Sequence, residues 1–462
     1  MSSFDLVIVG SGPGGYVAAV RASQLGMRVA IVEEDRLGGV CLNWGCIPTK
    51  AILKAAEQFD AVRKGEVPGL KVSGIEADYG SVIDASRKAA DRLNRGVGVL
   101  MKKGQIEVVQ GRGTLTGNGG VSVKTPEGER QLQGAKILLA TGSTELILPG
   151  VEVDGVRVLT SREALESRVM PRSLVVVGGG AVGLEFAYSY AAYGSEVTVI
   201  EMADQILPGF DSDVAQALAS SFSKRKIKIR TKTAYRAVER SGDGVTVTVE
   251  GEKGEEQLRA EQILFGVGRR ALVEGIGLAE AGVNVERNFI KVGKDYKTSA
   301  ENVYAIGDCI GAPLLAHKAS EEGVAAVEFM AGARKHPLDY GKIPACIYCQ
   351  PQVASVGLSE AQARAAGHDV RVGKAPFVAS GKAVGTGHTE GFVKLVTDAK
   401  HGEILGCQII GADATELIAE ATLAMSLEAT VHEIAETSHA HPTLAEMVKE
   451  AALAAQGRPL NF

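Results

Sequence analysis

Two cysteines five positions apart, Cys41 and Cys46, are the residues of this chain best suited to redox chemistry. They lie in the segment GGVCLNWGCIPTK, residues 38–50. Buried free thiols, part of a metal site and a redox-active disulfide are the alternatives, although the further ligands that a metal needs are not nearby. A disulfide requires Cα atoms about 4.4–6.8 Å apart, whereas residues five apart in an ideal helix are about 8–9 Å apart. A bridge is therefore possible only if the helix is irregular or begins here, and Gly45 can supply the irregularity.

A second group of residues suited to chemistry lies near the C-terminus. His441 and Glu446 are five positions apart, and Pro442 stands at the start of a predicted final helix over residues 442–455. A neutral imidazole can take a proton from a thiol near pH 7, because its ordinary pKa is about 6.5. A carboxylate beside it would fix the tautomer and stabilise the imidazolium. The two residues form a candidate acid–base pair. His439 could take part directly in the proton transfer or only support the pair.

A motif that could position such chemistry occurs twice. Each copy is a strand leading into Gly-x-Gly-x-x-Gly, then a helix, then a strand that ends in a glutamate 23 positions after the first glycine. In a dinucleotide-binding βαβ unit the first glycine makes the tight turn, the second admits the pyrophosphate and the third packs helix on strand. The acid takes the ribose hydroxyls. The residues are Gly10, Gly12, Gly15 and Glu33 in the first copy, and Gly178, Gly180, Gly183 and Glu201 in the second.

The remaining elements are predicted from hydrophobic periodicity. The strands of the two units are expected at residues 4–10, 28–32, 173–178 and 196–200. Residues 51–100 look largely helical, whereas residues 105–140 and 226–268 look like short strands with glycine turns. The C-terminal part mixes a strand at 392–396 with helices at 415–427 and 442–455.

Composition limits the class of protein. A chain of 462 residues is long enough for roughly three domains. The net charge of −5 gives no electrostatic footprint for nucleic acid. No apolar run approaches the roughly 20 residues of a membrane span, and no apolar signal segment opens the chain. Six cysteines do not make a disulfide scaffold. We expect a soluble, cytoplasmic protein with no membrane or nucleic-acid partner.

In its ordered motifs the whole chain resembles the pyridine nucleotide–disulfide oxidoreductases. The resemblance rests on both glycine motifs, on residues 38–50, on Ala140–Ser143, on Tyr304–Asp308 and on His439–Glu446. It implies an α/β fold with two Rossmann-like dinucleotide-binding domains, for FAD and NAD, and a C-terminal α+β dimerisation domain. The domains are expected at residues 1–145 (FAD, first part), 146–270 (NAD), 271–342 (a central segment completing the FAD site) and 343–462 (interface).

The resemblance also implies a role for each matching residue. Cys41 and Cys46 would form the redox-active disulfide, with His441, Glu446, Lys50 and Glu185 as the other catalytic residues. FAD would be held by Gly10, Gly12, Gly15, Glu33, Lys50, Thr141, Gly142, Ser143, Asp308, Ala316 and His317. The nicotinamide cofactor would be held by Gly178, Gly180, Gly183, Glu201 and Gly268. No metal site is implied.

The choice between NAD and NADP can be argued from the residues. A carboxylate at Glu201 accepts hydrogen bonds from a ribose 2′-hydroxyl and would repel a 2′-phosphate, which requires arginine. Residues 202–205 include no Arg or Lys, so NAD is favoured.

By resemblance the reaction is the oxidation of protein-bound dihydrolipoyl groups with reduction of NAD+. Lipoyl-bearing proteins of 2-oxo acid dehydrogenase or glycine cleavage complexes would be the partners. His441 would act on the disulfide of a second subunit, so a homodimer is expected, and the His441–Pro442 bond is predicted to be cis. A related disulfide or mercuric reductase and a non-catalytic flavoprotein subunit are the alternatives.

Several residues receive no chemical role. Cys309 and Cys407 are predicted to be buried thiols. The same is predicted for Cys346 and Cys349, with a second redox pair or half of a metal site as the alternatives. Trp44 is expected either near the disulfide or as an ordinary core or surface aromatic residue.

Overall fold

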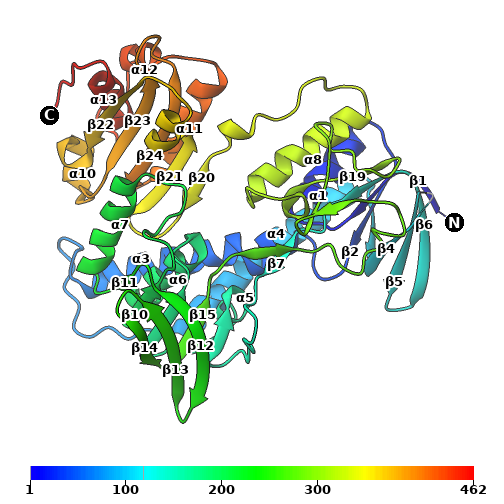
Figure 1. Ribbon diagram of the computed structural model, residues 1–462, viewed down its shortest axis with the longest axis horizontal. Helices are drawn as coiled ribbons and strands as arrows, with labels where there is room; N and C mark the ends of the chain where they lie inside the picture. Colours follow the sequence, from blue (N-terminus) through cyan, green and yellow to red (C-terminus); the bar gives the residue numbers. More distant parts are fainter. Residues whose placement is uncertain (1, 118) are drawn as a thin grey trace. The chain divides into compact units, whose positions relative to one another are not determined.

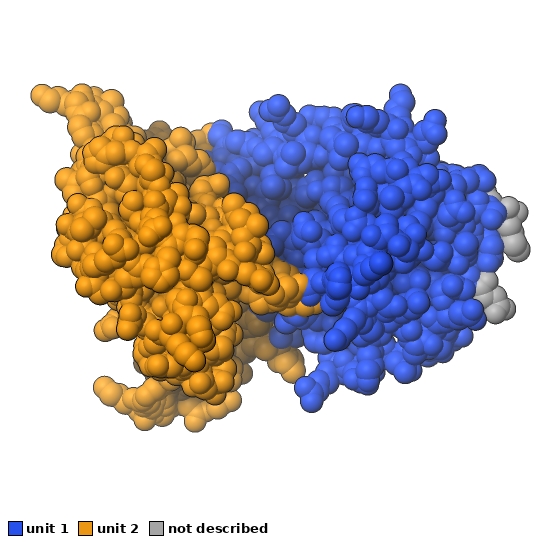
Figure 2. Space-filling model, turned by 90° about the horizontal axis from the view of Figure 1, so that it is seen from above, with its two compact units in different colours: residues 1–52, 80–146, 268–338 blue, residues 53–79, 147–267, 339–462 orange. Residues whose placement is uncertain are grey.

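The computed structural model describes residues 2–117 and 119–462 (Figure 1). The chain divides into two compact units, each made of three stretches of sequence (Figure 2). Unit 1 holds residues 1–52, 80–146 and 268–338, and unit 2 holds residues 53–79, 147–267 and 339–462. Among the described residues, no helix has the length and apolar character to cross a membrane.

Unit 1 is built on a seven-stranded sheet in the order β3-β2-β1-β6-β5-β4, with β19 also paired to β6. Strands β3, β2, β1, β6 and β19 pair with one another in parallel. Strands β4, β5 and β6 form an antiparallel meander. The strands are β1 (Ser2–Val9), β2 (Val29–Glu33), β3 (Glu107–Gln110), β4 (Arg112–Gly117), β5 (Gly120–Thr125), β6 (Gly128–Leu139) and β19 (Val303–Ala305).

The apolar run of β1 is explained by burial on both faces of this sheet. Val7 and Val9 point into one core cluster, whereas Leu6 and Ile8 point into the other, as the alternation of a strand requires. The second cluster includes the alanine-rich helices α1 (Pro13–Gln24) and α8 (Ala316–Met330), which pack against each other.

The rest of unit 1 consists of short pairs and further helices. Its two-stranded pairs are β7 (Ser143–Glu145) with β16 (Arg269–Ala271), and β17 (Val285–Glu286) with β18 (Phe289–Ile290). The other elements are α2 (Gly39–Trp44), α3 (Cys46–Arg63), α4 (Tyr79–Lys103) and the 3-10 turn η1 (Gly307–Ile310). The division into units falls within α3 and at the start of α4.

Unit 2 contains the second glycine motif, in a parallel five-stranded sheet ordered β11-β10-β9-β15-β8. Its strands are β8 (Val158–Thr160), β9 (Ser173–Val177), β10 (Glu196–Ile200), β11 (Lys228–Arg230) and β15 (Gln262–Phe265). The antiparallel sheet β12 (Ala234–Ser241), β13 (Gly244–Gly251) and β14 (Gly254–Ala260) follows in the same unit, with helices α5 (Ser161–Ala164), α6 (Ala181–Ala192) and α7 (Ser212–Lys224).

The C-terminal part of unit 2 is an antiparallel sheet in the order β20-β21-β24-β23-β22. The strands are β20 (Ala345–Ile347), β21 (Gln352–Gly357), β22 (Val370–Pro376), β23 (Phe392–Asp398) and β24 (Ile404–Gly411). The helical elements are η2 (Tyr340–Lys342), α9 (Glu360–Ala365), η3 (Phe377–Ala379), α10 (Gly381–Thr386), α11 (Ala414–Ser426), α12 (Val431–Glu436) and α13 (Glu446–Ala455).

One buried ammonium group joins three elements within unit 2. The Lys394 Nζ on β23 lies 3.1 Å from Asp211, 3.3 Å from Asp213 and 3.0 Å from Glu360, and the lysine side chain is 5% exposed. Asp211 precedes α7, Asp213 lies in its first turn and Glu360 begins α9. This Lys394 cluster therefore ties α7 and α9 to the C-terminal sheet.

Two predicted elements differ from the observed ones. The region 51–100 is helical only to Arg63 and again from Tyr79. The final helix is predicted over residues 442–455, but it begins at Glu446. The preceding loop instead turns so that the Glu446 carboxylate meets His441 and the Thr443 N–H, a side-chain arrangement that helical periodicity does not encode.

Candidate active site

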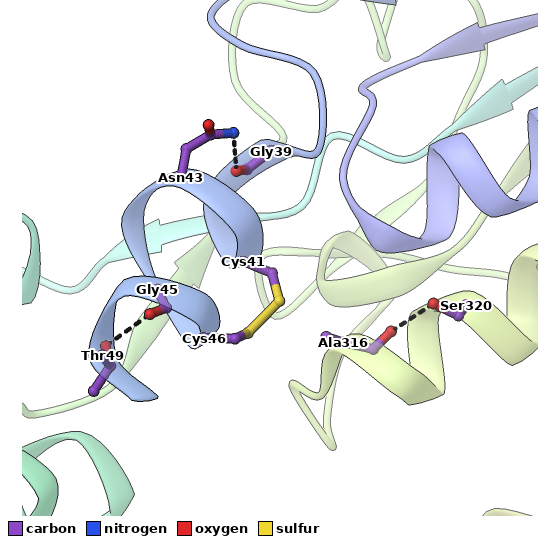
Figure 3. The surroundings of a disulfide bond; sticks show 8 residues. All are labelled: Gly39, Cys41, Asn43, Gly45, Cys46, Thr49, Ala316 and Ser320. Atoms are coloured by element: carbon purple, nitrogen blue, oxygen red, sulfur yellow. Dashed lines mark hydrogen bonds between the residues drawn. A yellow bond between two sulfur atoms is a disulfide. The ribbon is translucent and has the colours of Figure 1, made fainter. Parts of the chain in front are cut away.

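The two cysteines are joined across a break between helices (Figure 3). Helix α2 ends at Trp44, Gly45 takes the non-helical angles φ −153° and ψ −108°, and α3 begins at Cys46. The Cys41–Cys46 disulfide joins Cα atoms 4.7 Å apart. The predicted irregularity at Gly45 is confirmed, and the metal and free-thiol alternatives do not apply to this pair.

Polar contacts hold both sides of this break. The Asn43 amide donates to the Gly39 carbonyl at 2.9 Å, and the Thr49 hydroxyl donates to the Gly45 carbonyl at 2.7 Å (Figure 3). Ala316 and Ser320 of α8 lie in the surroundings of the disulfide. The disulfide therefore sits in a defined backbone frame within unit 1.

The first glycine motif has the backbone needed to hold a pyrophosphate. Gly10 has φ +100°, and a Cβ there would lie 2.3 Å from the Ala140 carbonyl oxygen, while a Cβ on Gly15 would lie 1.9 Å from the Gly10 carbonyl oxygen. A Cβ on Gly12 would meet nothing within 4 Å, so this backbone is open to an approaching group. Glu33 accepts from the Ser11 N–H at 2.9 Å and from its hydroxyl, which fixes the carboxylate beside the loop.

The second motif repeats this geometry in unit 2. A Cβ on Gly178 would lie 2.5 Å from the Gly266 carbonyl oxygen, and one on Gly183 would lie 2.0 Å from the Gly178 carbonyl oxygen. Gly180 is again open. Glu201 accepts from the N–H groups of Gly179 at 2.7 Å and Ala203 at 2.8 Å. Both motifs thus fit a dinucleotide, with close packing at the first and third glycines and space at the second.

The turn that carries Asp308 is joined to the segment after β6. The Ser143 hydroxyl donates to the Asp308 carboxylate, and the Arg269 Nε donates to the same hydroxyl at 2.7 Å. The Thr141 hydroxyl donates to the Leu272 carbonyl at 2.7 Å. Gly142 and Gly268 have φ values of +74° and +118°, and a Cβ on either would meet nothing within 4 Å.

Helix α8 presents an N-terminus without a side-chain cap. Ala316 is its first residue, Leu315 precedes it, and His317 is exposed. Its first N–H groups carry the positive end of the helix dipole, which favours a negatively charged ligand. Ala316 and His317 therefore lie at a helix end that favours negative charge.

The side chains of His441 and Glu446 are in contact within unit 2. The His441 Nδ1 lies 2.8 Å from Glu446 Oε1, and the Thr443 N–H donates to Glu446 Oε2 at 2.8 Å. Burial would raise the pKa of Glu446, but the Thr443 N–H and the His441 ring outweigh it and hold this pKa below its ordinary value. An ionised carboxylate at Nδ1 fixes the proton there, so Nε2 is the nitrogen that can take a proton.

Other polar contacts around this pair involve His439. Its ring is 6% exposed and lies between Glu420, 2.7 Å from Nε2, and the Thr437 carbonyl, 3.1 Å from Nδ1. His439 thus anchors the loop that carries His441. The His441–Pro442 peptide bond is cis, as predicted.

Glu185 and Lys50 lie in different units. Glu185 on α6 is 5% exposed, and its carboxylate accepts from the Tyr348 N–H at 3.0 Å. Lys50 is on α3, one turn after Cys46, and is partly buried. Both therefore remain candidates for the roles that the resemblance implies.

The other cysteines form no disulfide, and three of the four are buried, as predicted. Cys309, Cys349 and Cys407 are buried, whereas Cys346 on β20 is partly buried. Burial raises the pKa of Cys309 to about 11 and raises that of Cys407 further, so both stay protonated.

Trp44 is held by polar and charged groups rather than by the apolar core. Its Nε1 donates to Asp35 at 2.8 Å, and the Arg87 guanidinium lies 5.2 Å from the ring centroid.

Sequence reasoning missed three contributors to the site. Ser11 holds Glu33, Arg269 holds Ser143, and the buried pair Lys318 and Glu322 lies on α8. The i, i+4 spacing of the last pair was a visible signal. The partners of Ser11 and Arg269 are distant in sequence and gave none.

Residues 4–323 match the family model described as pyridine nucleotide-disulphide oxidoreductase, and residues 343–452 match its dimerisation domain. The chain is 46% identical to a dihydrolipoyl dehydrogenase of Zymomonas mobilis, with 99% of both chains covered. It is 43% identical to a dihydrolipoyl dehydrogenase of Bacillus subtilis, with 100% of both covered.

Solved structures agree with these sequence matches. The crystal structure of LpdA from Mycobacterium tuberculosis is similar with a TM-score of 0.91 and 27% identity, covering 98% of this chain and 99% of that one. RclA of Escherichia coli, a flavoprotein disulfide reductase induced by HOCl, is similar with a TM-score of 0.86 and 26% identity, covering 96% and 98%.

Proposed function

Because the chain belongs to the pyridine nucleotide-disulphide oxidoreductase family, and within it to the dihydrolipoyl dehydrogenases, we infer that it oxidises dihydrolipoyl groups to lipoyl groups and reduces NAD+ to NADH. It is an FAD- and NAD-dependent enzyme with an α/β fold that contains dinucleotide-binding and dimerisation domains. The observation that carries the proposal is the Cys41–Cys46 disulfide across the α2–α3 break. A disulfide oxidoreductase needs such a pair in reach of a thiol substrate.

The first half of the reaction uses the chain's own residues. A thiolate of the substrate attacks the Cys41 sulfur, the Cys41–Cys46 bond breaks, and Cys46 leaves as a thiolate. The second substrate thiol then attacks the mixed disulfide, closes the lipoyl ring and leaves Cys41 reduced. His441 removes the substrate's thiol protons through Nε2, and Glu446 stabilises the imidazolium that forms.

The second half returns the cysteine pair to the disulfide. When bound, FAD would supply the two-electron transfer from the dithiol to NAD+. We propose that the ADP part of FAD is held by Gly10, Gly12, Gly15 and Glu33. The remainder of FAD would be bound by Thr141, Gly142, Ser143, Asp308, Ala316, His317 and Lys50. Gly178, Gly180, Gly183, Glu201 and Gly268 are proposed to hold NAD. Glu185 and Lys50 are each proposed as a further catalytic residue.

The residues also support a homodimer as the active species. The His441 side chain is 77% exposed, although its Nδ1 is fixed by Glu446. An imidazole oriented by its own chain but open at Nε2 is suited to a disulfide on another subunit, and residues 343–452 match a dimerisation domain. We therefore propose that each active site takes its cysteines from one subunit and its base from the other.

Partners, compartment and domain limits extend the proposal. The lipoyl groups would be carried by proteins of 2-oxo acid dehydrogenase or glycine cleavage complexes, in the cytoplasm. The proposed domain limits are 1–145 and 271–342 for FAD, 146–270 for NAD and 343–462 for the interface. The positions of the two glycine motifs support these limits.

A turnover assay with dihydrolipoamide tests the function. The FAD-replete protein should reduce NAD+ rapidly and NADP+ at most slowly, because Glu201 would repel a 2′-phosphate. The absence of turnover with bound FAD would contradict the substrate assignment. The Cys46→Ser variant should retain FAD and lose turnover, and unchanged turnover in it would contradict the disulfide mechanism.

A further inference from the structure

An ion pair lies fully inside the core of unit 1, on helix α8. The Lys318 Nζ is 3.2 Å from Glu322 Oε1, and the two side chains are 1% and 0% exposed. Removing two charges from water is unfavourable, and a buried pair is often no more stabilising than apolar residues of the same volume. Stability alone therefore gives little reason for this pair, and its other contacts need an explanation.

Those contacts all lead to one turn of the backbone. The Lys318 Nζ donates to the carbonyl oxygens of Gly307 at 3.1 Å and Gly311 at 2.8 Å. The Glu322 Oε2 accepts from the Gly307 N–H at 2.7 Å. The pair thus binds the backbone of the turn η1 at Gly307, the first residue of the turn, and at Gly311, the residue that follows the turn.

Both gripped residues have backbone angles that few residues adopt. Gly307 has φ +76° and Gly311 has φ +115°. Such glycines gain many conformations when their hydrogen bonds are lost. The turn between them is therefore ordered by contacts from outside, and Lys318 and Glu322 supply three of these contacts.

The side chain that this turn presents is Asp308. Its carboxylate accepts from the Ser143 hydroxyl, so Asp308 is fixed from the side-chain end while the ion pair fixes its backbone. The same helix contributes Ala316 at its N-terminus. One buried pair therefore links two elements assigned to FAD, the Asp308 turn and the first turn of α8.

We propose that Lys318 and Glu322 are positioning residues, which set the Asp308 turn against α8 in the geometry that FAD binding requires. This inference rests on the proposed function, because it takes Asp308 and α8 as FAD-binding elements. Neither residue is exposed, so both act through the turn.

The test compares FAD affinity and fold stability in matched variants. The main variant is Lys318→Met with Glu322→Met, which removes both charges while keeping similar volume, so the apoprotein is expected to fold. FAD titration of the apoprotein should give an affinity lower by about tenfold. The visible circular dichroism of bound flavin should change as well, which a purely structural role would not produce.

A buried lysine in the other unit provides the control. Lys394→Met removes the ammonium group of the Lys394 cluster, far in sequence from the Asp308 turn. It should lower the melting temperature of the apoprotein but leave the FAD affinity within about twofold of the wild type. The single variant Glu322→Gln retains an acceptor for the Gly307 N–H. Its FAD affinity should therefore lie between those of the wild type and the double variant.

The outcomes separate this inference from the proposed function. A double variant that folds and binds FAD with wild-type affinity and spectrum would overturn the positioning role alone. A wild-type protein that turns over dihydrolipoamide while the double variant loses FAD affinity would support both. A wild-type protein that fails to bind FAD would overturn both.

Discussion

At the scale of single residues, the protonation state of each sulfur and nitrogen group follows from its neighbours. The His441 ring is fixed at Nδ1 by an ionised Glu446, whereas the Cys309 and Cys407 thiols are surrounded by apolar core. The lowered pKa of Glu446 keeps its carboxylate charged well below neutral pH. Reactivity is therefore expected at the exposed imidazole and the disulfide, and not at the buried thiols.

Replacing the acid–base pair should separate the two halves of the reaction. His441→Gln is expected to lower the turnover of dihydrolipoamide by about 10²–10⁴-fold, the usual contribution of a general base. Glu446→Gln should lower it less, because the imidazole remains. Bleaching of the bound flavin by NADH is the control and should persist in both variants. Unchanged dihydrolipoamide turnover in His441→Gln would contradict the assignment.

Thiol labelling should distinguish the cysteine classes. When the folded protein is reduced and treated with iodoacetamide at pH 8, Cys41 or Cys46 should be alkylated. Cys309 should remain unmodified, because burial raises its pKa to about 11. Peptide mass spectrometry reports the sites, and labelling in denaturant should reach all six cysteines. Stoichiometric modification of Cys309 in the folded protein would contradict this prediction.

At the scale of elements, the glycines within each of the two glycine motifs differ in function: some allow close packing and one leaves space for a ligand. The first and third glycines are enclosed by backbone oxygens, while the second faces open space. A methyl group added at the third glycine should therefore disturb folding, whereas one added at the second should disturb binding. The two effects can be tested separately.

Substitutions in the second motif exploit this difference. Gly180→Ala should fold normally and raise the KM for NAD+, because the added methyl group occupies the space left for pyrophosphate. FAD content should be unchanged. Gly183→Ala should destabilise the protein instead, because its Cβ would lie 2.0 Å from the Gly178 carbonyl oxygen. Steady-state kinetics and thermal denaturation measure the two effects, and an unchanged KM for NAD+ in Gly180→Ala would refute the assignment.

The Lys394 cluster predicts how stability depends on pH. Burial would raise the pKa of Asp213, but Lys374 and Lys394 lower it overall, and the pKa of Glu360 is lowered mainly by Arg364 with help from Lys394. Carboxyl groups with lowered pKa stabilise the fold above their unfolded values of about 4, and this stabilisation is lost as the pH falls below that range.

Lys394→Met tests this linkage. The variant should be less stable at neutral pH by about 3–5 kcal/mol, because it leaves the buried Asp211 carboxylate without its cation. Its loss of stability on acidification should be shallower than that of the wild type. Thermal denaturation between about pH 3 and pH 8 measures both. The exposed Lys382→Met on α10 is the control, and a wild-type pH profile in Lys394→Met would contradict the prediction.

The sequence predicted local features well and distant contacts poorly. The strand Glu196–Ile200, both glycine motifs and the break at Gly45 depend on residues close in sequence, and these predictions agree with the structure. The contact of Arg269 with Ser143 joins residues 126 positions apart, and no periodicity encodes it. Helix α13 begins at Glu446 and not at the predicted residue 442, because the contact of Glu446 with His441 is a side-chain arrangement that periodicity does not encode.

At the scale of the whole molecule, the catalytic groups belong to two chains in the proposed dimer. Mixing the Cys46→Ser and His441→Gln proteins, by co-expression or by dissociation and reassembly, should therefore restore activity. Half of a random mixture would be hybrid dimers, each with one intact site, so roughly a quarter of wild-type activity is expected. Each variant alone is the control. A mixture as inactive as its components would show that His441 acts within its own chain.

The exposure of His441 has a consequence for how activity depends on concentration. If the base reaches its disulfide only when two copies associate, catalysis obeys mass action between chains as well as between enzyme and substrate. Specific activity would then be constant in concentrated solution and would fall on dilution below the dissociation constant of the dimer. Concentrating the diluted chains would restore the rate.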